Sequence, residues 1–151
     1  MGITCSAVNA AASPFPDLHL ATWENTVPFI PPVSGGYVIK VYDGDTITIA
    51  NRLQIPNSPM YRFSVRLRGI NAAEIKPRNG PQFEEAIRAR DALAEMVLGK
   101  FVLLDNVGTE KYGRVLADVY VMWKTGKVHI NLCMLAGGLA VPFMTTTKGK
   151  Q

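Results

Sequence analysis

The chain has 151 residues, of which 48% are apolar, and it carries a formal net charge of +4. This length and composition suit one globular domain with a hydrophobic core and exclude a disordered chain. The sequence contains no apolar run long enough to span a bilayer. Residues 1–36 contain two acidic residues and no Lys or Arg, so all 16 basic residues lie in residues 37–151. A basic domain favours a polyanionic partner, although solubility alone would explain the same charge.

The first six residues match the N-myristoylation pattern, in which Gly2 becomes the N-terminus after removal of Met1 and Ser6 occupies the required position. Cys5 could carry a second acyl chain, and two chains anchor a protein far more stably than one. Because short patterns also match by chance, coincidence is the alternative. Acylation predicts the cytoplasmic face of a membrane in a eukaryotic host, with a membrane surface as a partner, and without it we expect a cytoplasmic protein.

Residues 1–36 predict an N-terminal arm, because they show no hydrophobic periodicity and end in Ser34-Gly35-Gly36. We expect this arm to be ordered only where its apolar side chains find a groove on the rest of the protein. The prolines that interrupt it are Pro14, Pro16, Pro28, Pro31 and Pro32, and its large apolar side chains are Phe15, Leu18, Leu20, Trp23, Phe29 and Ile30.

The folded domain is predicted to span residues 37–143, with residues 144–151 as a Thr- and Lys-containing tail. It begins with two short β-branched runs, 37–42 and 46–50. These runs flank the turn signal Asp43-Gly44, and the three segments together predict a β-hairpin.

Residues 61–70 alternate between apolar and polar side chains, a pattern that predicts a strand with one buried face. The opposite face carries three arginines, and like charges at this spacing repel each other unless an anion lies between them. A solvated outer face is the simpler alternative. We expect a functional role for Arg66 and solvent exposure for Arg62, and the sequence leaves Arg68 open between the two.

A helix is predicted over residues 81–98, with Pro81 at its start, where proline is tolerated. Strands over 101–105 and 114–122 follow, and then a short helix over 131–136. Five short strands with two helices predict a small α+β domain, in which a closed barrel carries the helices on its outside.

Three short motifs supply side chains suited to metal-assisted phosphodiester hydrolysis. Asp43-Gly44-Asp45-Thr46 provides carboxylates that can bind a hard divalent cation. The segment from Arg66 to Glu74 provides a guanidinium and a glutamate able to orient or deprotonate a water molecule, and Lys111-Tyr112-Gly113-Arg114 provides a second guanidinium. Each motif alone is weak, because a short Asp-Gly-Asp string is usually a turn, so the order and spacing of all three carry the signal.

In this order and spacing the chain resembles the staphylococcal nuclease (thermonuclease-like) family. The similarity runs from about Val38 to Ala140 and includes Ile130-Asn131 leading to Gly138-Leu139-Ala140. The resemblance implies an OB-type five-stranded β-barrel with two packed helices. It also implies a nuclease that depends on calcium or another divalent cation, cleaves DNA and RNA, and leaves a 3′-phosphate, and we expect a monomer.

The resemblance assigns roles to individual residues. Arg66 and Arg114 match the arginines that hold the scissile phosphate, and Glu74 matches the general base or water-orienting residue. Asp45 matches a carboxylate ligand of the metal, whereas Asn71 stands where the family has a second one. The remaining matches are the backbone carbonyl of Ala72 as a metal ligand, Asp43 as an acidic residue near the metal, and Lys111 and Tyr112 as contacts to a terminal phosphate.

Two departures from the family pattern keep an alternative open. The amide oxygen of Asn71 can still bind calcium, but the loss of one negative charge should lower the affinity. We also expect the family's third, C-terminal helix to be missing, together with the tyrosines that stack on a base, since Phe143 is close to their position but out of register. The alternative is a catalytically weak or inactive nucleic-acid-binding or scaffold module, and the presence of all three catalytic side chains favours the enzyme.

Overall fold

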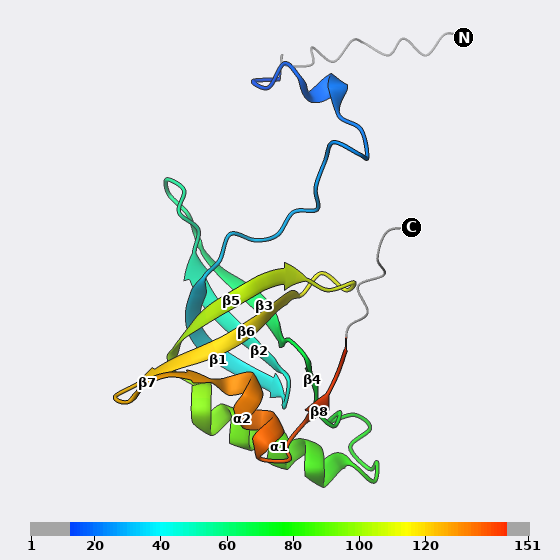
Figure 1. Cartoon of the computed structure of the whole chain (residues 1–151), viewed down its shortest axis with the longest axis vertical. Coiled ribbons are helices and arrows are strands. Elements are labelled where there is room, and N and C mark those ends of the chain that lie inside the picture. Colours follow the sequence, from blue (N-terminus) through cyan, green and yellow to red (C-terminus); the bar gives the residue numbers. More distant parts are fainter. Residues whose placement is uncertain (1–12, 145–151) are drawn as a thin grey trace, which may run out of the picture.

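Five β-strands close into a barrel, and the two α-helices lie against one end of it (Figure 1). The barrel strands are β1 (Gly35–Asp43), β2 (Thr46–Arg52), β3 (Met60–Leu67), β5 (Phe101–Thr109) and β6 (Val115–Trp123). They run in the order β3-β2-β1-β5-β6, and a parallel pairing of β3 with β6 closes the ring. The predicted α+β fold, a five-stranded OB-type barrel with two packed helices, is confirmed.

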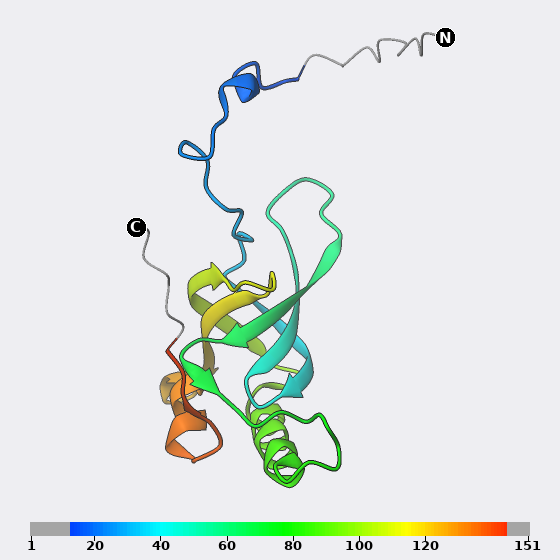
Figure 2. The ribbon, with the colours of Figure 1, turned by 90° about the vertical axis from the view of Figure 1, so that its right-hand side faces the viewer.

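Shorter elements complete the fold. Strand β7 (Gly126–His129) pairs with β6, and β4 (Ile70–Asn71) pairs with β8 (Val141–Pro142) in a small second sheet. Helix α1 (Phe83–Val97) packs on β1, whereas α2 (Ile130–Ala136) contacts both β6 and α1. Figure 2 shows both helices at the same end of the barrel.

The structure, a computed structural model, describes residues 13–144. Gly2 and Cys5 lie outside the described residues, so their acylation stays a prediction. Within residues 13–144 no helix is long and apolar enough to cross a membrane. The α-helices of this part of the chain are α1 and α2, and after β8 it ends at Met144.

The strand registers bring the predicted motifs together. On one side of β3, Arg66 lies opposite Thr46 of β2, the residue that follows Asp45. On the other side of β3, Arg66 lies opposite Leu116 of β6. Strand β6 begins directly after Arg114, so closing the barrel places both predicted phosphate-binding arginines at the same edge.

The alternation predicted for residues 61–70 is present, but the strand is shorter than expected. Val65 and Leu67 are fully buried and Arg62 is exposed, as the pattern predicts. Strand β3 ends at Leu67, and the chain turns at Arg68 before β4 begins. Arg68 therefore lies in a turn and not on the outer face of the strand.

Helix α1 begins at Phe83, two residues later than predicted. Pro81 lies in the preceding turn, and Gln82 is the N-cap residue. The side chains that α1 buries against the barrel are small or aliphatic, namely Ala86, Ala89, Leu93 and Val97.

The β1–β2 turn packs directly on α1 because residue 44 is glycine. A Cβ atom built on Gly44 would lie 2.7 Å from the Cβ atoms of both Ala72 and Ala89, closer than such atoms can approach. The missing side chain lets the turn that carries Asp43 and Asp45 sit between α1 and the segment after β4. This contact fixes the two carboxylates relative to the rest of the site.

Strand β5 is longer than the predicted 101–105 and continues to Thr109. Its pairing with β6 shifts register between Asp105 and Gly108, which is the signature of a β-bulge, and Asn106 adopts a φ of 50° there. The extra length carries the end of β5 to the same edge of the barrel as Arg66 and Arg68.

The described part of the arm, residues 13–34, extends away from the barrel and contains one 3₁₀ turn, η1 (Leu18–Leu20) (Figures 1 and 2). Its large apolar side chains are exposed, from 46% for Ile30 to 88% for Trp23. They are not buried in a groove of the described structure, so the packing on which we expected order of the arm to depend is absent there. Val33, at 6% exposure, belongs to the hydrophobic core just before the barrel begins at Gly35.

Replacing Leu93 by Ala should destabilise the protein by about 2–5 kcal/mol, because it removes a fully buried side chain between α1 and the barrel. The matched control is Leu98→Ala, at a leucine that is 49% exposed just beyond the same helix, and it should cost less than about 1 kcal/mol. Urea unfolding followed by circular dichroism measures both changes. Equal losses in the two variants would contradict the described packing.

Candidate active site

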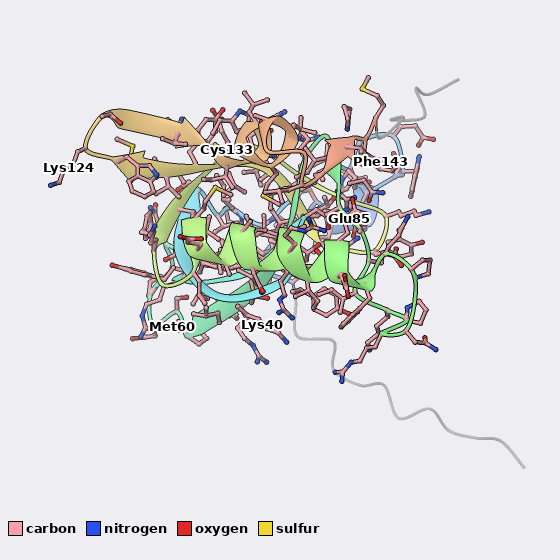
Figure 3. All side chains as sticks on the ribbon, turned by 90° about the horizontal axis from the view of Figure 1, so that it is seen from below. Lys40, Met60, Glu85, Lys124, Cys133 and Phe143 are labelled. Atoms are coloured by element: carbon pink, nitrogen blue, oxygen red, sulfur yellow. The ribbon has the colours of Figure 1, made fainter. Side chains whose placement is uncertain are left out.

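A cavity of about 1010 Å³ opens where the β1–β2 turn, the β3–β4 turn and the β5–β6 connection meet. Figure 3 shows Phe143, which lines this cavity, at the opposite end of the molecule from Lys124 in the β6–β7 turn. The arm contributes Val27, Pro28 and Ile30 to the rim. The cavity wall includes every predicted site residue of residues 13–144 except the buried Ala72, namely Asp43, Asp45, Arg66, Asn71, Glu74, Lys111, Tyr112 and Arg114.

Asp45 is a buried carboxylate, only 5% exposed, and protein donors satisfy both of its oxygens. The Thr46 hydroxyl donates to Oδ1 at 2.9 Å, and the backbone N–H of Ala72 donates to Oδ2 at 2.8 Å. Arg66 Nη2 lies 3.6 Å from the same Oδ2. The cost of burying this charge is therefore offset by two hydrogen bonds and one ion pair.

Asp43 lies close to Asp45, and the two carboxylates repel each other. The backbone N–H of Asp45 donates to Asp43 Oδ1 at 3.1 Å, which ties the Asp43 side chain to the backbone of Asp45. Burial, followed by the charge of Asp45, raises the pKa of Asp43 from 3.8 to about 6. Positive charge placed beside these two side chains would relieve the repulsion.

Arg66 is anchored along one edge of its guanidinium group. Nη1 donates to the backbone carbonyls of Leu67 at 3.1 Å and Ile70 at 2.9 Å, and Nη2 donates to Asn71 Oδ1 at 3.0 Å. The carbon of the guanidinium lies 5.3 Å from the centre of the Phe143 ring, a cation–π distance. These contacts fix the orientation of a cation that lines the cavity.

Arg114 is anchored by Glu110, four residues earlier in the β5–β6 connection. Arg114 Nη2 donates to Glu110 Oε2 at 3.2 Å, and the backbone N–H of Arg114 donates to Oε1 at 3.0 Å. Burial alone would raise the pKa of Glu110, but the hydrogen bonds and charge of Arg114 lower it overall. The hydrogen bond to Glu110 also raises the pKa of Arg114, while Nε of Arg114 is buried without a partner in the described residues.

Four predicted site residues, Asn71, Glu74, Lys111 and Tyr112, are exposed at the cavity. Glu74 lies in the loop that follows β4, on the same side as Asn71. Tyr112 is 73% exposed in the β5–β6 connection, and Lys111 Nζ lies 4.9 Å from the centre of its ring. Solvent exposure leaves these side chains free to meet a ligand that enters the cavity.

The oxygen donors near Asp45 suit a hard divalent cation. Two carboxylates converge at Asp43 and Asp45, and the Asn71 amide oxygen lines the same cavity. No group of three His, Cys, Asp or Glu side chains forms a metal cluster among residues 13–144, so a bound cation would also rely on neutral donors such as Asn71 and the Ala72 carbonyl. Neutral donors lower the affinity for calcium relative to a site with more carboxylates.

Sequence reasoning missed the roles of three residues that shape this cavity and left that of a fourth open. Glu110 anchors Arg114, Thr46 holds Asp45, and Phe143 lies against Arg66. Arg68, which the sequence left open, also lines the cavity. The role of Glu110 could have been suspected from its position four residues before Arg114. The contact of Phe143 with Arg66 depends on the pairing of β8 with β4, so no local sequence pattern predicts it.

Asp43→Asn should stabilise the protein at pH 8, by up to about 3 kcal/mol, and should have little effect at pH 4. The raised pKa of Asp43 means that the unfolded chain loses this proton between pH 4 and 6, before the folded chain does, so ionised Asp43 costs folding stability above that window. Urea unfolding in the presence of a chelator measures the difference. Asp91→Asn, on the exposed face of α1, is the control, and an equal gain there would contradict the proposed repulsion.

Comparison with known proteins agrees with this geometry. Residues 64–151 match the family described as Staphylococcal nuclease homologue. The chain is 34% identical over 110 residues to "Protein ParB" of Escherichia coli and 32% identical over 111 residues to "Micrococcal nuclease" of Shigella flexneri, which is 70% of this chain in each case. It spans about half the length of these curated relatives, 55% and 56% respectively. The chain belongs to the staphylococcal nuclease homologue family.

Proposed function

We propose that the chain is a metal-dependent nuclease that hydrolyses phosphodiester bonds in DNA, RNA or both. One observation carries this proposal: a buried carboxylate (Asp45), two anchored arginines (Arg66 and Arg114) and an exposed glutamate (Glu74) line a single cavity. The printed name of the Shigella flexneri relative, "Micrococcal nuclease", supports it. We expect the protein to act as a monomer.

The residues can divide the reaction between them. A water molecule attacks phosphorus and gives its proton to Glu74, and the phosphorus–oxygen bond on the opposite side breaks as the leaving oxygen takes up a proton from solvent. The attacked phosphate passes through a more highly charged, five-coordinate state. Arg66 and Arg114 can donate hydrogen bonds to its equatorial oxygens, and their existing anchors mean that little reorganisation is needed. Following the family, we propose that the bond breaks to leave a 3′-phosphate and a 5′-hydroxyl.

Calcium is the cation we propose for the oxygen donors of Asp45, Asn71 and the Ala72 carbonyl, with Asp43 close by. When bound, it would supply positive charge beside the phosphate and polarise the attacking water. Backbone hydrogen bonds hold both carboxylates at this position. The N–H of Asp45 donates to Asp43, and the N–H of Ala72 donates to Asp45.

A nucleic-acid-binding or scaffold module is the second candidate function. The observation that favours it is the neutral amide of Asn71, which hydrogen-bonds to Arg66 and adds no charge to the metal site. Such a module would use the basic residues of the cavity to bind phosphate. It would not catalyse hydrolysis, because the metal binds too weakly. Hydrolysis and binding assays separate the two candidates.

Glu74→Gln should reduce hydrolysis of single-stranded DNA and RNA by about 10²–10⁴-fold, because the variant cannot accept the proton of the attacking water. Initial rates with labelled oligonucleotides, over calcium concentrations from micromolar to tens of millimolar, measure the loss. Glu84→Gln replaces an exposed glutamate in the first turn of α1 and should leave the rate unchanged. Binding without hydrolysis by the unmodified chain at every calcium concentration would favour the module.

Asn71→Asp should lower the calcium concentration needed for half-maximal activity, because it adds a negative charge to the donor set. Arg66 Nη2 already contacts Asn71 Oδ1, so the new carboxylate gains a cationic partner in the fold. Calcium binding measured by calorimetry should tighten in parallel. Asn79→Asp, in the exposed loop before α1, is the control, and the same shift in both variants would show that general charge and not the site is responsible.

A further inference from the structure

Arg68 is a third arginine in the wall of the cavity. It lies in the turn between β3 and β4, where its backbone N–H donates to the carbonyl of Ala117 at 2.9 Å. Its side chain crosses to the β5 bulge, and Nη2 donates to the backbone carbonyls of Asn106 at 2.7 Å and Leu116 at 3.3 Å. The guanidinium group is thus fixed by elements that are distant in sequence.

The charge of Arg68 has no acidic partner in the described structure. Arg66 lies 3.6 Å from Asp45 and Arg114 lies 3.2 Å from Glu110, so both are ion-paired. Among residues 13–144, no carboxylate oxygen lies within 4.0 Å of the Arg68 guanidinium, whose Nε is buried without a hydrogen-bond partner. A half-buried cation without an acidic partner is costly unless a ligand supplies the anion.

The way Arg68 is held matches the two arginines assigned to the scissile phosphate. Arg66 is anchored by the backbone carbonyls of Leu67 and Ile70, much as Arg68 is anchored by two other carbonyls. Arg114 likewise keeps a buried Nε without a partner in the described residues. All three guanidinium groups are therefore partly anchored by the protein and line one cavity.

The protein leaves space for Arg68 at Gly108. A Cβ atom added to Gly108 would lie 3.1 Å from Arg68 Nη2, so a side chain there would press on the guanidinium. Gly108, Thr109 and Lys111 line the same cavity as Arg68. Arg68 is thus a cation of the cavity wall that neither the metal donors nor the ion-paired arginines account for.

We propose that Arg68 binds a second phosphate of the polynucleotide, next to the phosphate held by Arg66 and Arg114. This inference rests on the proposed nucleic-acid function of the cavity. A nucleic acid strand carries a phosphate at every nucleotide, so an anion is available beside the scissile group whatever the base sequence. The residue gives the site a preference for polynucleotides that carry at least two phosphates.

The test is the binding of a fluorescein-labelled single-stranded oligonucleotide to the full chain, measured by fluorescence anisotropy over a range of salt concentrations. A chelator is present, so that binding is read without hydrolysis. Arg68→Leu should weaken binding by about tenfold and reduce the slope of log K against log salt by about 0.7, the value for one lost phosphate contact. Arg62→Leu, at an exposed arginine of the same strand region, should change neither quantity.

Arg68→Lys separates phosphate binding from a purely structural role. A lysine keeps the charge and should retain the salt slope, but it cannot reproduce the forked contact to Asn106 and Leu116. Thermal unfolding of the three Arg68 forms measures the structural part. If Arg68→Leu lowers the melting temperature while the salt slope stays that of the unmodified chain, Arg68 is a structural clamp and the proposal is overturned.

The remaining outcomes keep this proposal distinct from the proposed nuclease activity. A reduced salt slope in Arg68→Leu, together with no hydrolysis by the unmodified chain, supports the second phosphate site and rejects the nuclease. Normal hydrolysis with an unchanged slope rejects the phosphate site alone. If the unmodified chain binds neither DNA nor RNA, both proposals fail.

Discussion

The parallel pairing of β3 with β6 is the contact on which the site depends. The antiparallel pairings alone would leave β3, and the first residues of β6 before its pairing with β7, with unpaired edges. Their pairing closes the barrel and places Arg66 opposite Leu116, two residues beyond Arg114. Two guanidinium groups from distant parts of the chain therefore share one cavity, and each is held by local contacts that the closed barrel supports.

Charge balance is the second constraint on the cavity. The ion pairs of Arg66 with Asp45 and of Arg114 with Glu110 neutralise most of the buried charge. Burial, followed by the charge of Asp45, raises the pKa of Asp43 to about 6. Arg68, by contrast, has no acidic partner in residues 13–144. The arrangement suits the simultaneous binding of a cation and a polynucleotide. The cation would balance the carboxylates of Asp43 and Asp45, and a phosphate of the polynucleotide would balance Arg68.

Much of the candidate site could be predicted, because its residues lie in motifs whose chemistry is local. The hairpin signal placed Asp43 and Asp45 in one turn, and the alternation of β3 predicted that Arg66 points away from the core. The roles of Arg68 and Phe143 could not be predicted, because their contacts cross between β4, β5, β6 and β8. The exposed apolar side chains of the arm show another limit, since composition alone does not say whether the fold provides a groove for them.

The sequence by itself determined the fold class, the core-facing residues of the strands and the set of side chains available for chemistry. Hydrophobic periodicity and turn signals act between neighbours in the chain, so they can be read without knowing what packs against them. The tertiary structure alone decided which charges are paired, which carboxylate has a raised pKa, and which arginine of the cavity has no acidic partner in the described residues. Those properties depend on segments far apart in sequence, and the packing of the whole barrel offsets the entropy lost when they are brought together.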